Sequence, residues 1–453
     1  MRKDLIQKYN VPGPRYTSYP TVPYWNTETI NNVEWQDMVI RSFEESNELG
    51  LSIYIHLPFC EQLCTFCACI KHITKRHELE DPYLKSLLKE WSIYLELLPS
   101  TPNIKEVHLG GGTPTFFHPV NLRRLLEGIF DTANLLPSFE LSFEGHPNNT
   151  SLEHLSTLYD LGSRRVSFGV QDYDVTVQHA INRIQPFEAV KQVHEWATQL
   201  GYASISHDLV FGLPHQNAAK VKSTIEKTNA LRPDRIAYYS YAHVPWIKNV
   251  GQRGFSEQDL PSGKEKRELY EIGKRMFEEN GYLEIGMDHF ALPHDSLSKA
   301  MLEGFLHRNF MGYTAQHTQL MIGLGMSSIS DSWYAFSQNV KKLGDYQSLI
   351  DQGRLPQLRG HRLSTSDLIV RKHILNLMCQ FETFWDQSGQ DFAELGDCLQ
   401  DLEEMEKDGL VHLLPNGLKI TQAGRPFVRN VCMAFDLHLR RHKPETRIFS
   451  LTV

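Results

Sequence analysis

The sequence predicts an α/β protein whose central part is a partial (β/α)6 barrel, flanked by an N-terminal arm and a mostly helical, winged-helix-like C-terminal domain. Two observations predict this fold class. Short apolar runs alternate six times with longer helical patterns, and unusual polar or glycine residues stand where each run ends. Repeated strand–helix alternation implies parallel strands joined by right-handed crossovers.

Six apolar runs are expected to form the parallel strands. They are rich in β-branched and aromatic residues and end near Gly or Pro, which is typical of buried strands. They span residues 51–57, 104–110, 140–145, 165–170, 204–211 and 235–241. Between them, apolar residues recur three and four positions apart, the pattern of an amphipathic helix. These helical patterns span residues 81–98, 119–130, 151–161, 187–200, 216–230 and 262–280.

The strand ends favour a barrel over an open doubly wound sheet. A site built from all six ends requires those ends to converge, as in a barrel, whereas an open sheet concentrates its site at one switch point. A cysteine loop follows the first strand. Four of the other five ends carry Gly110–Thr113, Glu144, Gln171 and Ala242–His243, and Asp208 lies late in the fifth strand.

Three segments are expected. Residues 1–47 form an arm whose proline-rich part, Pro12–Pro20, either packs on the barrel or covers the active site as a lid. Residues 48–355 form the barrel. Residues 356–453 form the C-terminal domain, in which Pro415-Asn416-Gly417 predicts a hairpin turn between two strands. Because this domain has no basic excess, we interpret it as a structural cap.

Composition excludes several classes of protein. A net charge of −8 gives no support to nucleic-acid binding, which needs a clustered basic face. We expect no secretory signal, because Met1–Asn10 is charged and lacks an apolar core. No stretch approaches about 18 apolar residues, so we expect no membrane span. Seven cysteines, an odd number, argue against a disulfide framework and for a reducing compartment, so we expect a cytoplasmic protein.

The strongest chemical signal is a loop with three cysteines. Cys60, Cys64 and Cys67 are separated by three and two residues. Four thiolates would complete a zinc site, whereas three fill three corners of a 4Fe-4S cubane and leave one iron open to chelate a methionine-like ligand. The alternative is a zinc site with Cys69 or His56 as fourth ligand. The single residue between Cys67 and Cys69 disfavours it.

The glycine run Gly110-Gly111-Gly112 supports a ligand site beside this loop. Glycines at a strand end let a ligand approach the backbone, whose N–H and C=O groups can bind an amino-acid moiety. Glu144 ends the next strand, where a carboxylate needs a cationic or hydroxyl partner. An ordinary salt bridge is the alternative for Glu144. Phe66 can offer its backbone to an adenine.

Together, these motifs resemble the oxygen-independent coproporphyrinogen III oxidases of haem biosynthesis, which are radical S-adenosylmethionine (SAM) enzymes. The resemblance covers essentially the whole chain. The motifs that carry it are GPRYTSYPT, YIHLPFC, CTFCAC, HLGGGTPT, SFGVQD, HDLVFGLP, LHRNFMGYT and RNVCMAFD.

The resemblance implies a set of site residues. The cluster ligands would be Cys60, Cys64 and Cys67, and Cys69 and Tyr54 would act in catalysis without Cys69 binding iron. Members of the family bind two SAM molecules. The first would contact Tyr54, Gly111, Glu144 and Ile329. The second would contact Phe66, Gly112, Thr113, Gln171, Arg183, Asp208 and Ala242.

The resemblance also implies a reaction and its partners. Two propionates of coproporphyrinogen III would be decarboxylated to vinyl groups by a 5′-deoxyadenosyl radical, giving protoporphyrinogen IX. We expect an electron donor such as flavodoxin or ferredoxin, and a monomer. Arg15 and Arg308 are our candidates for binding substrate carboxylates.

Departures and rival functions stay open at this point. Gly145 and His146 stand where the family more often has Val and Asp, and Ala68 replaces a usual glycine. One rival is a haem-binding chaperone of the same fold, which generally has Phe at the position of Cys69 and lacks the GPRYTSYP arm. The other rival is a radical SAM haem-degrading methyltransferase.

Overall fold

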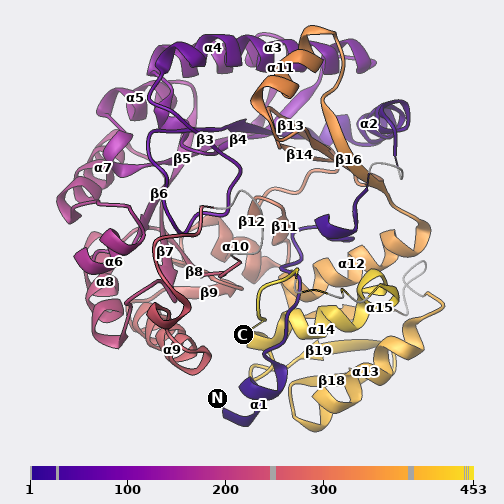
Figure 1. Ribbon diagram of the computed structural model, residues 1–453. Coiled ribbons are helices and arrows are strands. Elements are labelled where there is room, and N and C mark those ends of the chain that lie inside the picture. Colours follow the sequence, from indigo (N-terminus) through magenta and orange to yellow (C-terminus); the bar gives the residue numbers. More distant parts are fainter. Residues whose placement is uncertain are drawn as a thin grey trace.

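A computed structural model of the protein describes residues 3–26, 30–244, 251–385, 392–442, 444, 446 and 448–452. Figure 1 shows a curved sheet with helices along its outer side and a smaller, yellow domain beside one end of the curve. The indigo N-terminal helix lies against that smaller domain. The chain therefore has a barrel-like part, a C-terminal domain and an arm that reaches both.

Six parallel strands form the centre of the sheet in chain order, as the sequence predicts. Buried apolar side chains explain why these runs form strands, since all seven residues of the first strand are buried. The strands are β1 (Leu51–Leu57), β4 (Asn103–Gly111), β5 (Asn134–Gly145), β6 (Ser163–Gln171), β7 (Ser204–Phe211) and β8 (Arg235–Ser240).

The predicted helices follow these strands and cover the outer side of the sheet (Figure 1). Their apolar stripes pack on the strands; Leu84, Leu87 and Trp91, for example, are at most 1% exposed. The helices are α3 (Glu80–Leu97), α4 (Pro119–Phe130), α5 (Leu152–Asp160), α7 (Phe187–Leu200), α8 (Ala218–Leu231) and α9 (Gly263–Glu279), with the short α6 (Val175–Ala180) between β6 and α7.

The sheet is mixed and longer than the sequence indicates. It has twelve strands, and β1 has a second parallel neighbour, β13 (Met321–Leu324). Antiparallel strands extend it on that side: β14 (Ile329–Asp331), β15 (Ala335–Asn339) and β16 (Gln357–Arg362). On the other side lie β10 (His289–Ala291) and β9 (Leu283–Gly286). Because β16 and β9 stand at opposite ends of the strand order, the barrel is partial.

The C-terminal domain combines helices with a three-stranded sheet. Strands β18 (Val411–Leu414) and β19 (Gly417–Ile420) form the predicted hairpin, and β17 (Glu382–Phe384) pairs with β19. The helices α12 (Thr365–Gln380), α13 (Leu395–Lys407), α14 (Val428–Phe435) and α15 (Leu437–Arg441) pack with them around an apolar core. This core also includes Ile285 and Leu297 from the barrel part, so the two parts share buried surface.

The N-terminal arm threads between these parts. It begins with α1 (Lys3–Tyr9) and ends with α2 (Asn32–Ser46). Tyr16 and Tyr19 are each 2% exposed and belong to the C-terminal core. The Tyr16 hydroxyl donates to Asp436 Oδ2 at 3.1 Å, and Arg429 Nε donates to the Pro14 carbonyl at 2.8 Å. The arm is therefore a packed part of the fold.

Shorter elements complete the described structure. They are β2 (Phe59–Cys60), β3 (His72–Ile73), β11 (His307–Asn309), β12 (Gly312–Thr314), α10 (Ser296–Glu303) and α11 (Leu343–Asp351). Strands β2 and β3 pair in parallel and bracket the cysteine loop. Among the described helices, we find none with the length and apolar character needed to cross a membrane.

Candidate active site

The carboxyl ends of the parallel strands open into a cavity of about 680 Å³, which we call the cluster cavity. A volume of this size lies within the range of about 300–1,000 Å³ that is usual for small-molecule sites. Most residues singled out from the sequence line it: Cys60, Cys64, Phe66, Cys67, Cys69, Gly111, Gly112, Thr113, Glu144, Gln171, Arg183, Asp208 and Ala242.

The cysteine loop presents its sulfur atoms to this cavity. Cys60 ends β2, and the loop turns so that the Cys67 N–H donates to the Cys64 carbonyl at 3.2 Å. Cys60, Cys64 and Cys67 are half-buried, Cys69 is exposed at the cavity wall, and all four are free thiols. The loop thus offers accessible sulfur ligands.

Polar groups surround these thiols. The Thr113 hydroxyl donates to Cys60 Sγ at 3.3 Å, and Arg183 Nη1 donates to Cys64 Sγ at 3.6 Å. Burial raises the pKa of the Cys60 thiol to about 11, so a metal ion is what would keep this sulfur ionised at neutral pH. The hydrogen bond from Cys69 lowers the pKa of Cys67 to about 6. The donors Thr113 and Arg183 and the hydrogen bond from Cys69 favour anionic sulfur, whereas burial opposes it at Cys60.

The spacing of the sulfur atoms bears on the kind of metal centre. In the described residues, no group of three potential ligand atoms within 4.8 Å of one another includes a cysteine. The three thiols are thus not gathered around a single point, as zinc ligands with bonds of about 2.3 Å to sulfur would be.

Gly251 and Gln252, which the sequence analysis did not single out, form hydrogen bonds with the cysteine loop. The Gly251 N–H donates to the Cys67 carbonyl at 3.0 Å. Gln252 Nε2 donates to the carbonyls of Ala242, at 2.7 Å, and Phe66, at 3.3 Å. Gln252 thereby joins the end of β8 to the loop. It lies outside any strand or helix pattern, so periodicity could not have found it.

The glycine run at the end of β4 needs glycine for steric reasons. Gly111 has a φ of +116°, and a Cβ there would lie 2.7 Å from His56 Nδ1. A Cβ at Gly112 would lie 2.5 Å from the Pro58 carbonyl oxygen. Both positions also line the cavity, so the predicted contact of their backbone with a ligand stays a prediction.

Glu144 stands opposite this run at the end of β5. The Gly111 N–H donates to Glu144 Oε2 at 3.3 Å, and His108 Nε2 lies 3.6 Å from Oε1. Burial opposes ionisation of Glu144, but His108 and the Gly111 N–H outweigh it and hold the pKa below its usual value. His108 was missed, although its position two residues before Gly110 places both on one face of β4.

Tyr54 and Ile329 lie outside the cavity lining. The buried Tyr54 hydroxyl bonds His56 Nδ1 at 3.0 Å, and His56 Nε2 bonds the Ile70 carbonyl at 3.0 Å. Because burial lowers the pKa of His56 to about 4, the ring is neutral, with Nε2 donating and Nδ1 accepting. Tyr54 thus contacts the segment after the cysteine loop through His56, which bonds the Ile70 carbonyl. Ile329 packs beside Trp25, Phe336 and Leu363.

Asp208 and Arg183 bring opposite charges to the far side of the cavity. Ser167 Oγ donates to Asp208 Oδ1 at 2.8 Å, and burial raises the pKa of Asp208 to about 7. Arg183 donates to the Gly169 carbonyl, while its buried Nε has no partner among the described residues. Gln171, with a φ of +67°, lies beside them at the end of β6.

The two predicted substrate arginines differ in position. Arg15 lines the cavity, with Nη1 3.0 Å from Asp288 Oδ2 and Nη2 donating to the Ser240 carbonyl at 3.2 Å. Arg308 is 5% exposed and lies outside the cavity lining, where it donates to the Arg15 carbonyl at 3.4 Å. Arg15 therefore gives the arm one contact with the cavity.

The departures from the family pattern also line the cavity. Gly145, His146 and Ala68 all belong to its wall. Burial, and then the charge of Arg183, lowers the pKa of His146 well below its usual value. His146 therefore presents a neutral ring next to Arg183.

Comparison with known proteins agrees with this geometry. Residues 54–228 match the model of the radical SAM superfamily. An oxygen-independent coproporphyrinogen III oxidase of Synechocystis sp. is 37% identical over 99% of this chain and 97% of its own length. One of Pseudomonas aeruginosa is 39% identical over 96% of this chain and 95% of its own length.

A solved structure is similar as well. The Escherichia coli coproporphyrinogen III oxidase, described as a radical SAM enzyme, is 35% identical, covers 94% of this chain and 98% of its own, and has a TM-score of 0.89. The fold and cavity thus define a radical SAM enzyme. Within that class, the chain belongs to the family of oxygen-independent coproporphyrinogen III oxidases.

Proposed function

We propose that this protein converts coproporphyrinogen III to protoporphyrinogen IX without oxygen, decarboxylating two propionates to vinyl groups. One observation carries the proposal. The three free cysteines, Gly111, Gly112, Asp208 and Arg183 all line one cavity at the carboxyl side of the parallel strands. The curated relatives, matched over nearly the whole chain, bear the name of this activity.

Cys60, Cys64 and Cys67 would hold a 4Fe-4S cluster. These residues line the cavity, and Thr113 and Arg183 donate to the sulfur atoms of Cys60 and Cys64, which suits ionised ligands. When bound and reduced, the cluster supplies the electron that cleaves SAM to methionine and a 5′-deoxyadenosyl radical. Cys69 remains at the wall, with its carbonyl accepting from Lys71 Nζ at 3.1 Å.

Two SAM molecules would share the cavity. The Gly111 backbone and the Glu144 carboxylate suit the amino-acid part of the first, because an ammonium prefers a carboxylate that is held ionised. Asp208 and Arg183 offer the second one an acceptor for its ammonium and a donor for its carboxylate. For each propionate, one hydrogen atom and one electron leave with CO2. An external one-electron acceptor and a donor such as flavodoxin or ferredoxin are therefore needed.

Anaerobic incubation tests the function. Protein with reconstituted cluster, coproporphyrinogen III, SAM and a reductant should yield protoporphyrinogen, with two methionines released per product. Each propionate needs one radical, so a ratio far from two would contradict this stoichiometry. Haem binding or methyl transfer without decarboxylation would instead favour the chaperone or the methyltransferase.

A further inference from the structure

Two histidines and an aspartate lie together where the barrel part meets the C-terminal domain. His361 stands in β16, Asp367 in the first turn of α12, and His438 in α15. Each residue offers one ligand atom, and these three atoms lie within 4.8 Å of one another. The chain passes from β16 into α12, and α15 lies beside α12 (Figure 1). We call these three residues the histidine cluster.

The carboxylate of Asp367 lies between the two imidazole rings. His438 Nε2 donates to Asp367 Oδ1 at 2.8 Å, and His361 Nε2 lies 3.6 Å from Oδ2. Tetrahedral ligands at about 2.1 Å from a zinc ion stand about 3.4 Å apart, and the two spacings lie on either side of this value. Imidazole nitrogen and carboxylate oxygen are both zinc ligands. The cluster thus has the donor atoms and the spacing of a zinc site.

His361 is the residue that points to a bound ion. Its side chain is 9% exposed, and neither ring nitrogen has a hydrogen-bond partner among the described residues. The 3.6 Å between His361 Nε2 and Asp367 Oδ2 is too long for a hydrogen bond. Buried nitrogen atoms almost always have a partner, because a buried donor or acceptor without one costs free energy. A metal ion would give one of the two nitrogens its partner.

The other two residues are held in position by their neighbours. The Ser364 N–H and hydroxyl donate to Asp367 Oδ2 at 2.9 and 2.8 Å, which leaves Oδ1 directed to His438. Hydrogen bonds of this kind fix the orientation of carboxylates that bind metals. The rings of Tyr19 and Tyr24, from the arm, lie 5.8 Å from the His438 ring. The His438 side chain is 18% exposed, so the cluster borders on solvent.

We propose that His361, Asp367 and His438 bind a zinc ion through one nitrogen of each imidazole and Asp367 Oδ1, with water as the fourth ligand. Zinc would replace the proton that His438 Nε2 donates to Asp367, and this proton leaves to solvent. Because its ligands come from β16, α12 and α15, the ion would join the barrel part to the C-terminal domain. None of the three residues lines the cluster cavity, so the zinc site is independent of the proposed function.

Metal analysis of the holoenzyme tests the proposal. Untagged protein with its reconstituted 4Fe-4S cluster is brought to equilibrium with Zn²⁺ by anaerobic dialysis, and zinc and iron are measured together. The wild type should bind one zinc ion at the histidine cluster while its iron content stays constant. H361Q and H438Q should each bind zinc at least about tenfold more weakly, because each variant loses a ligand.

The matched control is a histidine–aspartate pair without a third ligand. His294 Nε2 lies 2.7 Å from Asp234 Oδ1, and no third potential ligand among the described residues joins this pair within 4.8 Å. H294Q should therefore bind zinc as the wild type does. Circular dichroism and iron content verify that each variant is folded.

Thermal unfolding gives a second measurement. An ion that binds only the folded state stabilises it, so zinc should raise the Tm of the wild type and of H294Q by about 2 °C or more. It should leave the Tm of H361Q and H438Q unchanged.

Several results would overturn the proposal. One is a wild type that binds no zinc, or binds it only as iron leaves, because that zinc is held by the cysteine loop. Another is zinc held by H361Q and H438Q as tightly as by the wild type. Zinc that is lost in H118Q but kept in H361Q belongs instead to His77, Glu80 and His118, the other group of three potential ligands among the described residues.

Discussion

The cysteines of the cluster cavity and those of the C-terminal core have opposite surroundings. Cys60, Cys64, Cys67 and Cys69 lie at the cavity wall beside donors and cations. Cys379, Cys398 and Cys432 are at most 4% exposed among apolar side chains. Burial raises the pKa of Cys379 to about 12 and that of Cys398 to about 11, but it also raises that of Cys60 to about 11, so access to the cavity separates the two groups and the pKa does not. The same residue type is therefore a candidate metal ligand in one region and an inert core side chain in the other.

Two aspartates repeat this contrast. Burial raises the pKa of both Asp208 and Asp436. Asp436 accepts from the Tyr16 hydroxyl and the Leu439 N–H, at 3.1 and 2.9 Å, so its oxygens hold the arm and cap α15. Asp208 accepts from Ser167 and also lines the cavity. A raised pKa alone does not identify a site; access to the cavity does.

The largest effect should come from removing a cluster ligand. In Cys64→Ser, product formation should fall by more than about 100-fold, exceeding the roughly 10- to 100-fold typical of second-layer partners of a metal. Iron and sulfide analysis after anaerobic reconstitution should show that most of the cluster is lost. Cys432→Ala is the matched control. If Cys64→Ser kept native iron, our ligand assignment would be wrong.

A smaller effect should follow the loss of Cys69. Cys69→Ser should keep near-native iron and sulfide, because Cys69 is proposed not to bind the cluster. Turnover should still fall by about tenfold or more, as for residues adjoining a metal ligand. Iron content, the EPR signal of the reduced cluster and product formation should be measured together. Loss of iron in this variant would make Cys69 a ligand.

Protonation of Asp208 should weaken SAM binding by an intermediate amount. The pKa of Asp208 is raised to about 7, so lowering the pH through this value neutralises the acceptor of an ammonium group. We expect SAM to bind about tenfold more weakly at about pH 6 than at about pH 8. Isothermal titration calorimetry at both pH values measures the dissociation constant of SAM. In Asp208→Asn the difference should vanish; a pH effect that persists in this variant belongs to another group.

The smallest functional effect is expected in the C-terminal core. Cys432→Ala removes a buried sulfur that is 0% exposed, and the small void should lower the free energy of unfolding by about 1–2 kcal/mol. Denaturant unfolding measures this change. Iron content and turnover should stay within about twofold of wild type. Loss of iron in Cys432→Ala would show that a cysteine of the C-terminal core is also needed for the cluster.

Local patterns made much of this protein predictable. A strand that is buried on both faces appears in the sequence as a continuous apolar run. Such runs predict β1 and β4 to β8, and the order of these strands in the sheet is the predicted one. The spacing of Cys60, Cys64 and Cys67, the strand-end position of Glu144 and the place of Asp208 within β7 are also sequence properties. Because parallel strands end at one edge, these residues were expected in one place, and they line one cavity.

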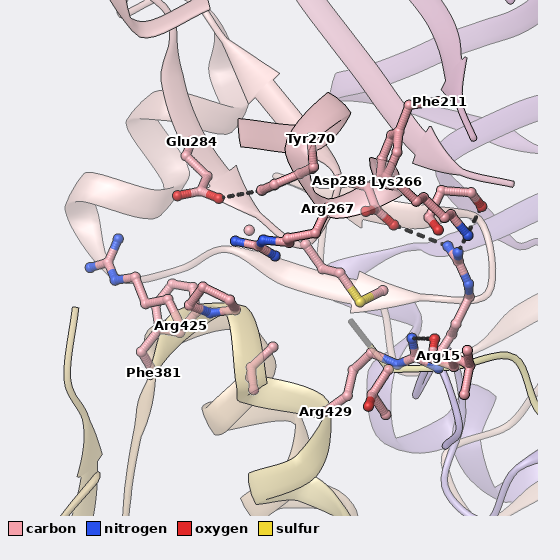
Figure 2. A pocket seen from close by; sticks show the side chains of 17 residues that line it. Arg15, Phe211, Lys266, Arg267, Tyr270, Glu284, Asp288, Phe381, Arg425 and Arg429 are labelled. Atoms are coloured by element: carbon pink, nitrogen blue, oxygen red, sulfur yellow. Dashed lines mark hydrogen bonds and ion pairs between the residues drawn. The ribbon is translucent and has the colours of Figure 1, made fainter. Parts of the chain in front are cut away.

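Only the tertiary structure decided the remaining features. Strands β14 and β15 are short and carry polar residues, so no local pattern predicts them. The buried Asn339 at the end of β15 donates its Nδ2 hydrogen to Glu90 Oε1 at 2.7 Å, although the two residues are 249 positions apart in the sequence. Gln252 acts through carbonyls brought to it by folding. A small basic pocket beside the cluster cavity joins residues from Arg15 to Thr452 (Figure 2). Their charges come close to one another only when the arm, α9 and the C-terminal domain pack together. Electrostatic interaction depends on distance in space and not on separation along the chain.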